Sequence, residues 1–120
     1  MKRAALLIAL TLAACATTPS QARPTARLGQ VATIGNVRIR PLAVIEDSRC
    51  PINALCVWAG RLVVRADIRA GGRRQIVSLE LGKPQQIAGG TLILTAAEPS
   101  KMAGTDTERR AYRFTFRFAR

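Results

Sequence analysis

Residues 61–81 read RLVVRADIRAGGRRQIVSLEL, and the alternation within them decides the class of fold. Through residues 61–70, apolar side chains alternate with mostly charged ones, which is the pattern of a strand with one buried face. Gly71 and Gly72 come next, and two consecutive glycines supply the positive φ angles of a tight hairpin turn. Residues 74–81 then alternate again. The stretch therefore predicts an antiparallel β-hairpin.

Similar alternation recurs on both sides of this hairpin. Residues 112–119 place four aromatic side chains on one face, which we expect to fill the core; the alternative is a platform for stacking bases or sugars. Residues 91–97 predict another strand. Upstream, residues 37–45 predict a long strand in which Pro41 requires an edge position or a bulge, and residues 30–34 predict a short one.

About six strands with short connections predict an all-β fold. We expect a single antiparallel β-sandwich or small barrel, which we place at residues 28–120. Two longer irregular connections interrupt the pattern, at residues 46–60 and 99–110. If function lies in loops carried on a rigid scaffold, these two connections are the candidates.

The N-terminus has the composition of an export signal. Residues 2–3 are basic, residues 4–12 are apolar, and residues 12–15 read LAAC. The last four resemble the lipobox of bacterial lipoproteins, which implies that residues 1–14 are a cleaved signal peptide and that Cys15 is acylated. The apolar run falls short of the roughly 20 residues that a spanning helix needs. An ordinary secretory signal or a buried apolar helix are the alternatives.

Residues 15–27 predict a lipidated cysteine followed by a flexible tether, because they carry two prolines and no apolar periodicity. The lipobox resemblance implies attachment to the lipid bilayer through Cys15. Ala16 stands where an Asp would retain some lipoproteins in the inner membrane. We therefore expect an outer-membrane anchor, with the domain facing the periplasm of a Gram-negative bacterium.

The chain has three cysteines, an odd number. If Cys15 carries lipid, Cys50 and Cys56 remain as an even pair in an oxidising compartment, where a disulfide is expected. The loop that such a bond closes is short, so it contributes only about 2 kcal/mol by the chain-entropy estimate.

Residues 47–60, DSRCPINALCVWAG, are the most distinctive motif of the domain. They resemble a segment of small exported or lipid-anchored bacterial proteins of uncharacterised function, with the pattern D-S-R-C-P, four residues, then C-V-W-A-G. This resemblance implies export and the disulfide, and it implies no catalytic residue. We expect Trp58 to cover the disulfide or the open end of the sandwich, and Gly60 to permit the bend into the next strand.

Two interpretations of this segment stay open. It is either a structural crossover that holds two sheets together, or a recognition loop presented to a protein, as in a protease or lysozyme inhibitor. A constrained loop suits recognition because it loses less entropy on binding. The candidate partner residues are Arg49, Ile52, Asn53, Leu55 and Trp58.

The formal net charge is +12, from 19 Lys and Arg against 7 Asp and Glu. Such a field attracts anions. For an exported protein we expect anionic envelope lipid or polysaccharide as the partner and no nucleic acid; a genomic bias towards arginine is the alternative. The candidate anion-binding residues on predicted strands are Arg38, Arg40, Arg65, Arg69, Arg113 and Arg117.

The composition argues against an enzyme. The chain has no histidine, so a Ser-His-Asp or Cys-His site is impossible, and its carboxylates are scattered. We expect no metal site and no cofactor. The leading hypothesis is a membrane-anchored, non-enzymatic envelope-binding module with a basic surface. The alternative is a periplasmic protein-binding or hydrolase-inhibitor module that presents the loop between Cys50 and Cys56.

Overall fold

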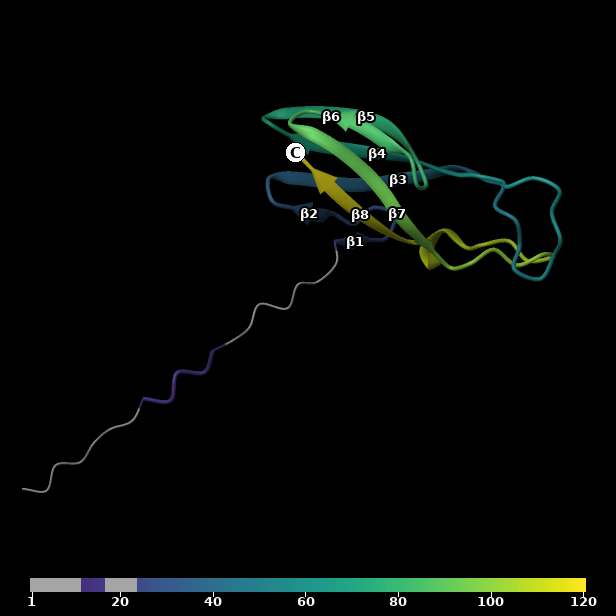
Figure 1. The fold of residues 1–120 in the computed structure, drawn as a ribbon, viewed down its shortest axis with the longest axis horizontal. Coiled ribbons are helices and arrows are strands. Elements are labelled where there is room, and N and C mark those ends of the chain that lie inside the picture. Colours follow the sequence, from purple (N-terminus) through teal and green to yellow (C-terminus); the bar gives the residue numbers. More distant parts are fainter. Residues whose placement is uncertain (1–11, 17–23) are drawn as a thin grey trace, which may run out of the picture.

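The computed structural model describes residues 12–16 and 24–120, and residues 24–120 are dominated by β-strands (Figure 1). The strands are β1 (Thr25–Ala26), β2 (Ala32–Ile34), β3 (Val37–Asp47), β4 (Leu62–Ala70), β5 (Arg73–Glu80), β6 (Pro84–Ile87), β7 (Gly90–Glu98) and β8 (Arg113–Ala119), with a 3₁₀ turn, η1 (Arg109–Ala111), before β8. Residues 1–11, most of the expected signal peptide, lie outside the described residues, as do residues 17–23 of the expected tether.

Two four-stranded antiparallel sheets pack together as a β-sandwich and do not close into a barrel. One sheet has the order β1-β8-β7-β6 and the other has the order β2-β3-β4-β5. The predicted hairpin is β4–β5: Ala70 pairs with Arg73 across a two-residue turn. Gly71 and Gly72 have φ angles of 57° and 72° there. The predicted irregularity at Pro41 is a bulge, since the register of β3 against β4 shifts between Pro41 and Ala43.

The number of strands differs from the expected six. Residues 24–120 contain two further strands, β1 and β6. Thr25 pairs with Thr115 of β8, so the two residues of β1 belong to the sandwich and not to the tether that we expected over residues 15–27. The folded domain therefore begins before residue 28. β6 pairs only with β7, and both added strands lie at the two edges of the same sheet.

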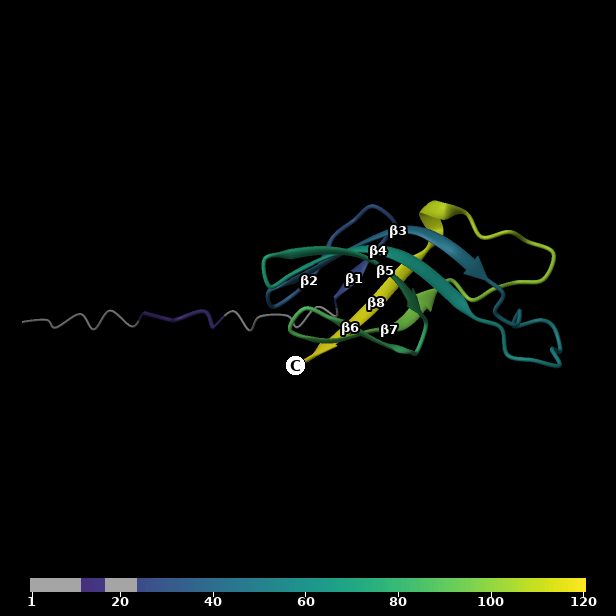
Figure 2. The same ribbon diagram turned by 90° about the horizontal axis from the view of Figure 1, so that it is seen from above.

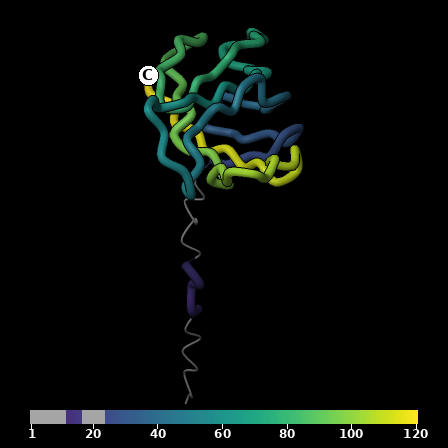
Figure 3. The backbone as a smooth tube through the Cα atoms, turned by 90° about the vertical axis from the view of Figure 1, so that its right-hand side faces the viewer, coloured from purple at the N-terminus to yellow at the C-terminus, as the bar shows by residue number. Residues whose placement is uncertain are grey.

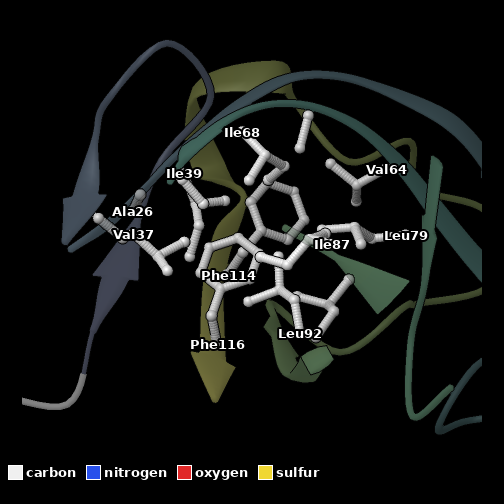
Figure 4. Packing of buried hydrophobic residues seen from close by; sticks show 14 of the residues in the cluster. Ala26, Val37, Ile39, Val64, Ile68, Leu79, Ile87, Leu92, Phe114 and Phe116 are labelled. Carbon is white, nitrogen blue, oxygen red and sulfur yellow. The ribbon is translucent and has the colours of Figure 1, made fainter. Parts of the chain in front are cut away.

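The core lies between the two sheets (Figure 4). β4 contributes five buried apolar residues, and Phe114 of β8 is fully buried at the centre of the core. The rings of Tyr112 and Phe114 stack with centroids 5.7 Å apart. Tyr112, Phe114 and Phe116 are all at least nine-tenths buried. The aromatic face of residues 112–119 is therefore core, as its alternation predicts.

Two long connections from different sheets emerge at the same end of the sandwich (Figures 1 and 2). We call residues 48–61, between β3 and β4, the Cys loop, and residues 99–112, between β7 and β8, the second loop. Both views place the tips of these loops well away from the start of β1.

Candidate functional site

The Cys loop and the second loop are held against each other by hydrogen bonds (Figure 3 views the molecule from this end). The backbone N–H of Ile52 donates to the carbonyl of Lys101 at 2.9 Å, and the N–H of Ala103 donates to Oδ1 of Asn53 at 2.8 Å. Arg49 donates to the carbonyls of Ala97 at 3.3 Å and Pro99 at 3.1 Å. The two loops therefore form one unit.

Asp47, the last residue of β3, is the centre of this unit. Its carboxylate accepts two hydrogen bonds from the guanidinium of Arg49, at 2.8 and 2.9 Å, and one from the hydroxyl of Tyr112, at 2.8 Å. Its backbone carbonyl accepts one from Nζ of Lys101 at 2.5 Å. The Asp47 and Arg49 side chains are only 10% and 15% exposed, so this ion pair is screened less than a surface pair.

These contacts shift the ionisation of the groups that make them. Burial acts to raise the pKa of Asp47, but the hydrogen bonds from Arg49 and Tyr112 and the charge of Arg49 outweigh it, so the pKa lies below its ordinary value. Burial and the hydrogen bond to Asp47 raise the pKa of the Tyr112 hydroxyl. The hydrogen bond to Asp47 raises the pKa of Arg49, which stays charged.

The lowered pKa of Asp47 predicts acid sensitivity. The ionised carboxylate of Asp47 stabilises the folded state. This stabilisation is complete above the pKa of about 3.9 that Asp47 has in the unfolded chain, and it is lost as pH falls through the lower pKa of the folded state. The pKa of Tyr112 is raised, so the stabilisation that its protonated hydroxyl gives the folded state is lost as pH rises above about 10.

Asp47→Asn should lower the free energy of unfolding at neutral pH by about 2–3 kcal/mol, because Arg49 loses its charged partner. Urea unfolding at several pH values measures both effects.

Asp106 supplies the matched control, because it is an exposed carboxylate of the second loop with no ion pair in the described residues. Asp106→Asn makes the same charge change and should leave stability within about 0.5 kcal/mol of the starting protein. An equal loss of stability in both variants would contradict the role given to Asp47. So would an Asp47→Asn variant whose stability falls at acid pH as steeply as that of the starting protein.

The Cys loop carries an unusual amount of exposed apolar surface. Within the loop, Cys50 and Cys56 form a disulfide that closes residues 50–56 into a ring, with their Cα atoms 5.9 Å apart. Four large apolar side chains of the loop face solvent: Ile52 is 70% exposed, Leu55 104%, Val57 89% and Trp58 72%. Several large exposed apolar side chains on one loop mark an interaction site more often than a single one does.

The five candidate partner residues divide into two groups. Ile52, Leu55 and Trp58 are exposed, whereas Arg49 and Asn53 hold the Cys loop to the second loop. The expectation that Trp58 covers the disulfide or the end of the sandwich is wrong, because the ring faces solvent. The sequence analysis did not single out Val57; its place beside Trp58 in the uncharged stretch of residues 51–59 was the only available signal.

The six candidate anion-binding arginines do not form one surface. Arg38, Arg40, Arg65 and Arg69 are exposed on β3 and β4, on the outer face of one sheet. Arg113 and Arg117 are exposed on β8, which belongs to the other sheet. Sequence alternation identifies the outward face of each strand, but it does not tell which sheet the strand joins.

The remaining expected features concern Cys15, metals and the membrane. Cys15 is exposed and takes no part in the disulfide. Within residues 12–16 and 24–120, no group of three or more His, Cys, Asp or Glu side chains is placed to hold a metal ion. In the same residues, no helix has the length and hydropathy needed to cross a membrane.

Comparison with known proteins adds no relative: no family model matches the chain, and neither the curated proteins nor the solved structures contain a significant match. The resemblance of residues 47–60 to small exported bacterial proteins therefore stays a prediction.

Proposed function

We propose that this chain is a non-enzymatic binding module of the bacterial envelope, anchored through acylated Cys15, which captures a protein partner with its Cys loop. The observation that carries the proposal is the exposure of four large apolar side chains on the Cys loop. Ile52 and Leu55 lie within the ring that the disulfide closes, and Val57 and Trp58 directly follow it. Between Pro51 and Ala59 this loop has no charged residue, so the partner surface that fits it is an apolar pocket or cleft. The active-site cleft of an envelope hydrolase is one such surface.

The energetics favour these side chains as binding anchors. Burying a Leu, Val or Ile side chain on association contributes roughly 1.5–3 kcal/mol, and Trp is enriched among the residues that dominate interfaces. Leu55, Val57 and Trp58 make such a gain available because their surface is exposed in the free protein. These side chains therefore supply apolar anchors for a complex with a partner.

The loop is also restrained before it meets a partner. The disulfide closes residues 50–56 of the loop, and hydrogen bonds from Ile52 and to Asn53 fix the loop against the second loop. A loop held in one arrangement loses less conformational entropy on binding, which raises affinity. The contacts around Asp47 therefore serve recognition by holding the loop in place.

The anchor is supported by the sequence of residues 1–15, with its basic start, apolar run and lipobox-like end. The segment between Cys15 and Pro24 reaches at most about 30 Å when extended. Since the loop tips lie well away from the start of β1, an anchored domain has room to present them to other envelope proteins (Figure 2).

A double substitution tests the loop. Leu55→Ser with Trp58→Ser should abolish capture of the partner from envelope extracts, measured by affinity capture and mass spectrometry against the starting protein. Both side chains are exposed, so the melting temperature should change by no more than about 2 °C. Trp58 is the only tryptophan, so a blue shift of its emission in the starting protein reports burial of the loop by the captured partner.

Ile45→Ser with Ile76→Ser is the matched control, since these residues are 54% and 55% exposed on strands β3 and β5. This control should retain capture. Capture that survives the loop substitutions, or a blue shift with phosphatidylcholine vesicles in place of a protein, would count against protein recognition; the second result would assign the loop to the membrane surface.

A further inference from the structure

The outer face of the β2-β3-β4-β5 sheet carries a row of arginines that the pairing of the strands brings side by side. Arg69 of β4 lies directly opposite Arg38 of β3 on one side and Arg74 of β5 on the other. Like charges directly opposite each other in a sheet are destabilising. Such a row costs stability in the free protein, and this cost is removed when an anion binds.

One carboxylate lies within this face, and it is already paired. Asp67 is 6% exposed, and Nε of Arg74 contacts both of its carboxylate oxygens, at 3.1 and 3.0 Å. A terminal nitrogen of Arg74 lies 3.0 Å from the same group. In the described residues, Arg38, Arg40 and Arg69 make no ion pair. Three positive charges therefore remain around one neutralised pair.

These three arginines surround a hollow in the surface. A recess of about 90 Å³ is lined by Val31, Arg38, Arg40, Asp67 and Arg69. Arg38 and Arg69 also line a second, wider hollow that continues towards the β4–β5 turn and Arg73. The face is therefore concave where its positive charge is concentrated.

We propose that the recess between Arg38, Arg40 and Arg69 binds a phosphate group. Guanidinium groups match phosphate oxygens in pairs, and these hydrogen bonds are strengthened by charge. Because Asp67 in the lining is already paired with Arg74, a group with more than one negative charge suits a recess lined by three unpaired arginines better than a single carboxylate does. The phosphate belongs either to a lipid head group or to a free phosphorylated compound. This proposal does not rest on the Cys loop, which lies at the end of the sandwich.

Arg69→Gln tests the recess in the full chain. Inorganic pyrophosphate, added at constant ionic strength, should raise the melting temperature of the starting protein. Arg69→Gln should weaken pyrophosphate binding, measured by calorimetric titration, by about tenfold or more. Without pyrophosphate the same variant should melt at a temperature equal to or above that of the starting protein, because the repulsion in the arginine row is relieved. A purely structural arginine would show the opposite change.

Arg117→Gln is the matched control, because Arg117 is exposed on β8 of the other sheet. Its neighbour on β7 is the uncharged Ile93, so it does not lie opposite another arginine there. The Arg117→Gln variant should bind pyrophosphate as the starting protein does, whereas Arg38→Gln should be weakened like Arg69→Gln. Equal weakening by Arg117→Gln, or no protection by millimolar pyrophosphate, would overturn the proposal.

Vesicles distinguish the two sources of phosphate. Co-sedimentation with vesicles that contain phosphatidic acid, whose phosphomonoester carries more than one negative charge, would identify a lipid head group if it is lost in Arg69→Gln and absent with phosphatidylcholine alone. Pyrophosphate binding that depends on Arg69, without any vesicle binding, would identify a free phosphorylated ligand. Vesicle binding that is equal in Arg69→Gln and Arg117→Gln would be non-specific attraction of the basic chain and would contradict a site at the recess.

Discussion

Phe114→Ala is expected to lower the free energy of unfolding by about 4 kcal/mol, because the ring is fully buried between the two sheets. For a domain of this size that loss corresponds to a fall in melting temperature of roughly 20 °C. The substitution removes an aromatic ring that lies among the core side chains (Figure 4). It also removes the stacking of this ring against Tyr112. Urea unfolding and thermal melts measure the effect.

Phe118→Ala is the control, since Phe118 lies on the same face of β8 but is only partly buried. It should cost clearly less than Phe114→Ala. If Phe114→Ala does not fold, Phe114→Leu keeps most of the apolar volume and should cost about 1–2 kcal/mol. Equal losses at the two positions would mean that the centre of the core has been misplaced.

Gly60→Ala is expected to cost about 3 kcal/mol, although Gly60 lies in a loop. A Cβ at this position would overlap the backbone carbonyl of Ser48 and lie 2.9 Å from the backbone nitrogen of Arg49. The backbone of Ser48 is itself held, because its N–H donates to the carbonyl of Arg61 at 2.8 Å. A clash with backbone is relieved only by opening the base of the Cys loop, so the fall in melting temperature should be about 15 °C.

Ala59→Ser is the control for this prediction, because it adds one heavy atom at the neighbouring, exposed position. It should leave the melting temperature within about 2 °C of the starting value. Gly60 is needed here for a close approach of two backbone segments, and its φ angle is not among the positive ones. If Gly60→Ala melts like Ala59→Ser, the base of the loop is looser than the contacts of Ser48 indicate.

Both predictions bear on recognition as well as on stability. Gly60 lies at the base of the Cys loop. The core around Phe114 supports β8, and the hydroxyl of Tyr112, the residue directly before β8, reaches Asp47. A loosened base should raise the entropic cost of binding through the loop. Gly60→Ala should therefore weaken partner capture even though Leu55 and Trp58 are untouched.

The parts of the candidate site that are local in sequence were predictable. The disulfide between Cys50 and Cys56 and the short distance between Asp47 and Arg49 both follow from neighbouring residues. The hydroxyl of Tyr112, in contrast, reaches Asp47 across 65 positions of the chain. The alternation predicted that the ring of Tyr112 lies in the core, but it carries no information about which residue accepts a hydrogen bond from its hydroxyl.

The arginine row was hidden for a similar reason. Sequence alternation shows that Arg38, Arg69 and Arg74 lie on strands, but their alignment depends on the register between β3, β4 and β5. A shift of one residue would move each side chain to the other face of its sheet. The register is set by the turns and by the buried residues of the core, so the row exists only in the folded molecule.

The sequence by itself determined that the chain forms an antiparallel β-sandwich or barrel, because period-two alternation and paired glycines act over a few residues. Only the tertiary structure decided that the two sheets form a sandwich and do not close into a barrel. It also decided that β1 and β6 join one of these sheets. β1 has two residues and β6 has four, PQQI, so neither has enough alternation to be recognised as a strand from the sequence. These strands exist because the edges of β8 and β7 offer unpaired backbone groups, and that partner is supplied by distant parts of the chain.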